Sequence, residues 1–102
     1  MTKKDDTQIL VENETKLKEP EMFRVLLIND DYSTMEFVTH VLTLVFHMTL
    51  AQAERIMLKV HHEGRGVCGV FSYEIAEMKV NMVAEMARQH EFPLLCVMEE
   101  DR

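Results

Sequence analysis

Residues 23–37, with the sequence FRVLLINDDYSTMEF, contain the change from strand to helix that decides the fold. The apolar run at 25–28 predicts a short buried strand, because it consists of Val, Leu and Ile. The run Ser33-Thr34-Met35-Glu36 matches a capping box, which predicts a helix with its serine as the N-cap. Between strand and helix lies Asn29-Asp30-Asp31. Two adjacent carboxylates repel each other, so we expect a cation here: a metal ion, a basic partner or an amine.

The composition is typical of one small cytoplasmic domain that does not bind nucleic acid. The chain has 102 residues, of which 47% are hydrophobic, and a formal net charge of -7. A phosphate backbone repels such a chain, whereas basic or amine-bearing ligands are attracted to it. No apolar stretch approaches the roughly 20 residues of a membrane span, and residues 1–20 lack the apolar region of a signal peptide. No long exposed apolar patch is expected, which predicts a monomer.

The sequence as a whole predicts six elements in the order β-α-α-β-α-β. Strands are expected at about residues 22–28, 66–71 and 94–98, and helices at about residues 34–46, 50–63 and 73–90. Thr49 begins a second capping box, Gly64 supplies a left-handed helix end, and Ser72 is the expected N-cap of the third helix. This order predicts an α+β sandwich at residues 21–102, with a three-stranded sheet and three helices on one face. Residues 1–20 are polar and are expected to be a disordered, flexible tail.

The sequence gives little support for metal binding by Asp30 and Asp31 or for nucleophilic catalysis. A receiver-type magnesium site needs about five βα units, which this chain does not have. His61 and His62 cannot both face one zinc ion, because adjacent helical residues point about 100° apart. Cys68 and Cys96 lie within apolar runs and are expected to be reduced core residues without a histidine partner. We therefore expect no metal, no cofactor and no catalytic nucleophile.

An amine fits the pattern better. Met57, Val60 and His61 share one face of the second helix, and Met35 and Val38 share one face of the first. If these helices pack side by side, an apolar hollow forms whose rim carries Asn29, the two carboxylates and His61. An ammonium group has three donors and no acceptor, so a ring of acceptors suits it. The N-terminal residue of a polypeptide combines such an ammonium with a side chain.

Each of these features also has an ordinary structural explanation. Methionine and valine on an amphipathic helix are usually core residues, and Asn-Asp after a strand is usually turn chemistry. A histidine near a helix C-terminus is commonly a surface group that suits the helix dipole. Two other functions therefore stay open from the residues alone: a protein-interaction module without amine selectivity, and a metal-dependent hydrolase.

Four motifs add a resemblance to a known family. They are VLLINDDYSTMEFV, IMLKVHHEGRGVCGVF, EIAEMKV and FPLLCVMEE, in this order. Over about residues 22–100 the chain closely resembles the ClpS family of adaptors. The resemblance implies a protein that is not an enzyme. It implies binding of N-degron proteins through a free N-terminal Leu, Phe, Tyr or Trp, and their delivery to the ClpA unfoldase of the ClpAP protease. Neither nucleic acid nor a membrane is implied as a partner.

The resemblance also implies roles for individual residues. The α-amino group would be recognised by Asn29, Asp30, Asp31 and His61. The side-chain pocket would be lined by Leu27, Ile28, Ser33, Met35, Val38, Met57, Val60 and Leu94. Docking on the N-terminal domain of ClpA would use Glu74 and Lys79. The tail at 1–20 would engage the unfoldase during handoff.

Within this resemblance, Met35 and Ser33-Thr34 bear on which first residues are bound. Met35 matches the gatekeeper that excludes β-branched first residues. Ser33-Thr34 stands where many relatives have Thr-Pro, so the first helical turn lacks the preorganisation that proline supplies. This departure affects the expected ranking of first residues and leaves the amine-binding positions unchanged.

Overall fold

The computed structural model describes residues 20–102. The predicted tail therefore lies, apart from Pro20, outside the described residues. The elements are β1 (Met22–Ile28), α2 (Met35–Phe46), α3 (Leu50–Glu63), β2 (Arg65–Ser72), α4 (Tyr73–His90) and β3 (Leu95–Glu100). This order and the α+β class agree with the sequence prediction. Among these residues, no helix combines the length and apolar character that crossing a membrane requires.

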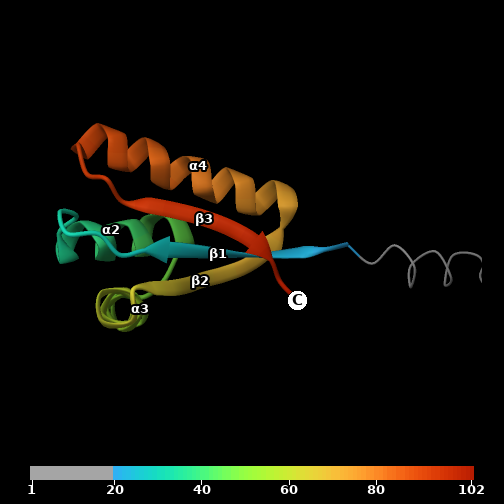
Figure 1. The fold of residues 1–102 in the computed structure, drawn as a ribbon, viewed down its shortest axis with the longest axis horizontal. Coiled ribbons are helices and arrows are strands. Elements are labelled where there is room, and N and C mark those ends of the chain that lie inside the picture. The colour runs from blue at the N-terminus through green and yellow to red at the C-terminus, as the bar shows by residue number, and fades with distance from the viewer. Residues whose placement is uncertain (1–19) are drawn as a thin grey trace, which may run out of the picture.

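The sheet is antiparallel throughout, with the strand order β2-β1-β3. Figure 1 shows β1 between its two neighbours, with α4 running beside β3 and α3 seen down its axis next to β2. The central place suits β1, because it carries the most apolar run of the chain and two flanking strands exclude water from it. Met22 pairs with Ser72 at one end of β1, and Ile28 pairs with Leu95 at the other.

All three helices pack against one face of this sheet. Their buried apolar residues form a single core with Val25 and Leu27 of β1, Cys68 of β2 and Cys96 of β3. Residues two apart on a strand share a face, which accounts for the selection of Val25 and Leu27. Both cysteines are free and buried, as expected from their apolar surroundings.

The opposite face of the sheet is covered by charged side chains. Arg24 Nη2 lies 2.9 Å from Glu99 Oε1, and Arg65 Nη2 lies 3.1 Å from Glu99 Oε2. Leu26 lies outside the helix-facing core, yet it is only 1% exposed. The alkyl stems of the charged residues therefore shield it from water. Because these ion pairs are partly exposed, shielding is their main contribution to stability.

Local sequence signals account for both ends of α3 and fail at the starts of α2 and α4. Thr49 and Gln52 form both bonds of the predicted capping box, at 3.2 and 3.0 Å. Gly64 ends α3 with a φ of 92°, as predicted. The N-cap of α2 is Thr34 and not Ser33, because Thr34 Oγ1 accepts the N–H of Phe37 at 3.0 Å. Ser72 occupies the N-cap of α4 but makes no capping side-chain bond.

Lys79 in α4 departs from the expectation of a docking residue. It is 9% exposed, and its Nζ donates to the carbonyl oxygen of Val45 at 2.8 Å. The ammonium also lies 5.8 Å from the ring centroid of Phe46 and 5.4 Å from that of Phe71. Val45 is in the last turn of α2, where carbonyls lack helical partners and a cation is favoured. Lys79 therefore joins α4 to the end of α2, and its charge is not presented to a partner.

Replacing Lys79 by Met should lower the free energy of unfolding by about 1–3 kcal/mol. The substitution keeps the side-chain length but leaves Val45 O buried without its donor. Urea unfolding followed by circular dichroism measures this loss. Lys59→Met is the matched control, because Lys59 is exposed on α3 and should change stability by less than about 0.5 kcal/mol. Equal stabilities of the two variants would contradict the role assigned to Lys79.

Candidate functional site

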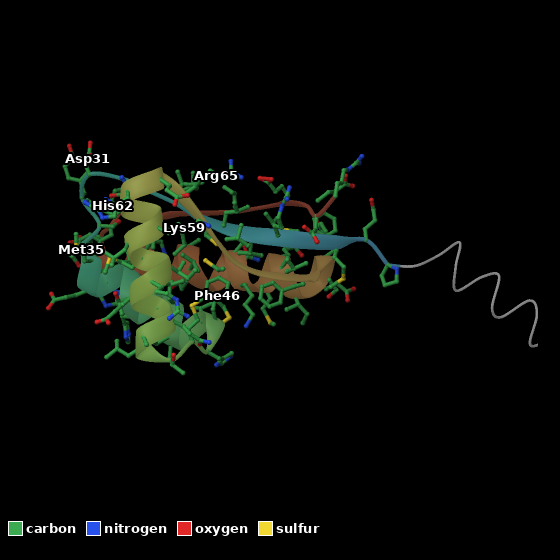
Figure 2. The ribbon with its side chains drawn as sticks, turned by 90° about the horizontal axis from the view of Figure 1, so that it is seen from below. Asp31, Met35, Phe46, Lys59, His62 and Arg65 are labelled. Atoms are coloured by element: carbon green, nitrogen blue, oxygen red, sulfur yellow. The ribbon has the colours of Figure 1, made fainter. Side chains whose placement is uncertain are left out.

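A cavity of about 230 Å³ opens where the end of β1 meets α2 and α3. It is lined by Asn29, Asp30, Asp31, Ser33, Met35, Val38, Met57, Val60 and His61. The structure thus brings together, from three separate segments, nine of the residues singled out for amine and side-chain recognition. Figure 2 shows Asp31 at the C-terminal end of α3 and Met35 beside the same helix. The volume suits a single amino-acid side chain, since it lies below the roughly 300 Å³ at which pockets for drug-sized ligands begin.

Three residues expected in the side-chain pocket do not line this cavity. Leu27 and Leu94 are 0% and 6% exposed and belong to the hydrophobic core. Ile28 follows Leu27 on β1, and strand alternation turns it toward the face that lacks helices. Leu27 and Leu94 therefore support the core from which the site is built, while Ile28 lies on the other side of the sheet.

Backbone contacts hold the end of β1 against the end of α3. The N–H of Asn29 donates to the carbonyl oxygen of Gly64 at 2.9 Å, just after β1 ends. The N–H of Gly64 donates to Val60 O, also at 2.9 Å, and closes the helix. This left-handed turn suits glycine, which has no Cβ. As a result, the Asn29 side chain and the His61 ring are both presented at the rim.

Gly66 lets α3 approach β2 closely beside the cavity. A Cβ atom at this position would lie 2.8 Å from Cγ2 of Val60, a distance that real Cβ contacts essentially never show. Val60 is 2% exposed and lines the cavity as well as the core. The absence of a side chain at Gly66 therefore allows Val60 to pack close to β2, and this position of Val60 determines how deep the cavity is.

The two adjacent carboxylates have different surroundings. Asp30 Oδ1 accepts the N–H groups of Tyr32 and Ser33, both at 2.7 Å, and so organises the loop before α2. Burial alone would raise the pKa of Asp30, but these donors hold its pKa below the ordinary value of 3.8. Asp31 is exposed and has no hydrogen bond or ion pair within residues 20–102. Asp31 is therefore the exposed carboxylate of the pair, whereas Asp30 keeps only its buried Oδ2 without a partner. The sequence did not distinguish the two.

The apolar wall and the histidines complete the site. Met35 is 48% exposed and Met57 is half-buried, so two flexible thioether side chains border the opening. His61 lines the cavity, whereas His62 packs against its ring at a centroid distance of 5.1 Å and does not line it. Within the described part of the chain, no group of three His, Cys, Asp or Glu residues could hold a metal ion.

The chain that forms this cavity matches known proteins over most of its length. Residues 18–97 match the family model described as "ATP-dependent Clp protease adaptor protein ClpS". The chain belongs to the ClpS family. It is therefore an adaptor of a Clp protease and not an enzyme, as the sequence motifs implied.

Curated relatives and a solved structure agree with this ClpS membership. The ATP-dependent Clp protease adapter protein ClpS of Rhodospirillum centenum is 53% identical over 95 residues, which are 93% of this chain and 88% of that protein. The corresponding protein of Syntrophus aciditrophicus is also 53% identical, over 93% of this chain and 89% of its own. The structure of Agrobacterium tumefaciens ClpS2 bound to L-phenylalaninamide is 36% identical, with a TM-score of 0.79. That likeness covers 80% of this chain and 99% of the other.

Replacing Asp30 by Ala should lower the free energy of unfolding by about 1 kcal/mol at neutral pH, because two loop N–H groups lose their acceptor. A pKa lowered in the folded state means that this stabilisation is complete above the ordinary carboxyl pKa. It is then lost as the pH falls through the lowered value. The difference between wild type and Asp30→Ala should therefore shrink in acid, as urea unfolding at several pH values would measure. Asp31→Ala is the control, and a loss as large as that of Asp30→Ala would show that the two carboxylates share the structural role.

Proposed function

We propose that this adaptor captures polypeptides that begin with a free α-amino group and a bulky hydrophobic residue such as Leu, Phe, Tyr or Trp. The observation that carries the proposal is one 230 Å³ cavity with an apolar wall and acceptor groups at its rim. The apolar wall is made by Met35, Val38, Met57 and Val60. The acceptors are the side-chain oxygens of Asn29 and Asp31 and a ring nitrogen of His61.

The ligand of the related Agrobacterium protein supports this proposal. L-phenylalaninamide has a free amino group, a phenyl side chain and an amide in place of the next peptide bond. It therefore has the chemical groups of the first residue of a polypeptide and little else. The fold surrounding that ligand has the same architecture as this chain, at a TM-score of 0.79.

Neither half of the cavity supplies enough affinity by itself. Burying a Leu- or Phe-sized side chain contributes roughly 1.5–3 kcal/mol, and each hydrogen bond to a charged group about as much. Association costs about 4 to 15 kcal/mol in lost translational and rotational freedom. Only a ligand that satisfies both halves therefore binds well. An internal leucine lacks the ammonium, and an acetylated terminus has lost its charge, so both are rejected.

We infer that the captured protein is delivered to the ClpA unfoldase through a surface at the start of α4. Glu74 is exposed in the first turn of this helix, so its carboxylate is accessible to a partner. Lys79 is buried, so in this fold the docking proposal rests on Glu74. The second alternative, a metal-dependent hydrolase, would need a water-activating ligand set, and no group of three His, Cys, Asp or Glu residues within 20–102 could hold a metal ion.

Four fluorescent peptides that differ only at the first residue test the capture directly. A peptide beginning with Leu should bind, while acetyl-Leu, Ala and Ile peptides should bind at least about tenfold more weakly. The reasons are the lost charge, the unfilled cavity and the second substituent on Cβ, respectively. Fluorescence anisotropy measures the four dissociation constants. Equal binding of Leu and acetyl-Leu peptides would contradict recognition of the α-amino group. It would favour the alternative function, a protein-interaction module without amine selectivity.

The exclusion of β-branched first residues should depend on Met35. Its side chain lines the cavity and is 48% exposed, so the branch of an Ile or Val ligand should meet it at the opening. Met35→Ala should therefore bind an Ile peptide at least about fivefold more tightly than wild type does. Leu58→Ala is the control, because Leu58 is exposed on α3 and lines neither this cavity nor the neighbouring groove. If Met35→Ala leaves the Ile peptide unchanged, the gate lies elsewhere.

A further inference from the structure

The methionines of this chain lie outside its core. Nine of the 102 residues are methionine, yet none of the buried hydrophobic side chains between residues 20 and 102 belongs to this residue type. Four methionines in this part of the chain are 39% to 48% exposed, namely Met22, Met35, Met78 and Met82. Their thioether sulfur atoms are therefore accessible to small oxidants from the solvent.

Met35 combines this exposure with a place in the cavity beside His61. Among residues 20–102, Met35 and Met57 are the two methionines that line this cavity. Met57 is half-buried and packs against the hydrophobic core, whereas Met35 is 48% exposed and does not belong to the core. In the described part of the chain, Met35 is thus the one exposed methionine whose chemical state a bound first residue would meet directly.

We propose that Met35 is a site of reversible oxidation that switches the capture of N-terminal residues off. The inference rests on the proposed function, because it assigns a regulation to the same cavity. Hydrogen peroxide is the oxidant. The sulfur atom attacks one oxygen of the peroxide, the O–O bond breaks and an S–O bond forms, so that methionine sulfoxide and one molecule of water are the products. The sulfur loses two electrons in this step, and the peroxide gains them.

The sulfoxide changes the apolar wall of the cavity in two ways that disfavour a ligand. Its oxygen is polar and must lose its water when a leucine or phenylalanine side chain of the ligand covers it. The same oxygen adds a heavy atom beside a cavity of only about 230 Å³, where the space for the first side chain is small. Because Met35 does not belong to the hydrophobic core, its oxidation should weaken binding and leave the fold intact.

The two cysteines do not compete for the oxidant. Cys68 and Cys96 are buried, and burial raises the pKa of both thiols to about 12. Peroxide reacts with the thiolate, which neither residue forms at neutral pH. Met78 has the same exposed fraction as Met35, but it lies on α4 and does not line the cavity. Met78 therefore serves as a reference that is oxidised under the same conditions without touching the ligand.

Oxidation of the full chain followed by peptide binding tests this switch. After treatment with hydrogen peroxide, the wild type should bind a Leu peptide at least about fivefold more weakly, with an unchanged circular dichroism spectrum. Mass spectrometry of proteolytic fragments reports the sulfoxide at each methionine, and over time the loss of binding should follow the sulfoxide at Met35 and not that at Met78. Methionine sulfoxide reductases A and B with a thiol reductant should restore the affinity.

Two variants separate Met35 from the other methionines, and each is compared with itself before and after oxidation. Met35→Leu keeps an apolar side chain of similar size, and its dissociation constant should change by less than about twofold on treatment. The control Met78→Leu/Met82→Leu removes two exposed methionines from α4 and should keep the wild-type loss of binding. The time course on the wild type decides the question even where a substitution at Met35 itself weakens binding.

The switch is overturned if the loss of binding persists in Met35→Leu or disappears in the control. It is also overturned if a sulfoxide at Met35 leaves binding unchanged, or if Met78 is oxidised while Met35 is not. These outcomes leave the proposed function intact as long as the reduced wild type binds the Leu peptide. Reduced wild type that fails to bind this peptide overturns the proposed function, whatever the state of Met35.

Discussion

The site depends on one backbone hydrogen bond, from the N–H of Asn29 to the carbonyl oxygen of Gly64. This bond joins the end of the central strand to the end of α3, two points that are far apart in the sequence. Through it, the polar residues after β1 face the helix that supplies Val60 and His61. The close contact of α3 with β2 at Gly66 acts in the same place, so the helix has little freedom to move away from the sheet. A binding site assembled in this way has its shape before the ligand arrives, which reduces the entropic cost of binding.

The adjacent carboxylates of Asp30 and Asp31 have different roles. Asp30 is turned into the loop and accepts two backbone N–H groups, while Asp31 is exposed at the rim. Because Asp30 is held by neutral donors, its negative charge also adds to the potential that a positively charged ligand meets at the cavity. Repulsion between the two groups is tolerated because two N–H donors stabilise Asp30 at Oδ1 and Asp31 is exposed to solvent.

The order of elements, the capping box at Thr49 and the grouping of cavity residues could all be predicted from the sequence. The first two depend on periodicity and on contacts between residues close in the chain, whereas the grouping followed from shared helix faces and from the resemblance to the ClpS family. The start of α2 could not, because the side chain of Asp30 competes for the N–H of Ser33 and moves the cap to Thr34. Lys79 was unpredictable for a similar reason, since its partner Val45 belongs to another helix and only tertiary packing brings them together. The predicted pocket positions of Leu27 and Ile28 were wrong for a different reason. Strand alternation decides which face of the sheet each side chain occupies, and a motif match carries no information about the face.

The buried cysteines have a practical consequence for work on this adaptor. Burial raises the pKa of both Cys68 and Cys96 to about 12, so neither forms a thiolate at neutral pH. They are also the only two cysteines of the sequence. A single cysteine introduced at an exposed position would then be the sole group to react with a maleimide dye. The native protein should thus serve as a cysteine-free background for site-specific labelling.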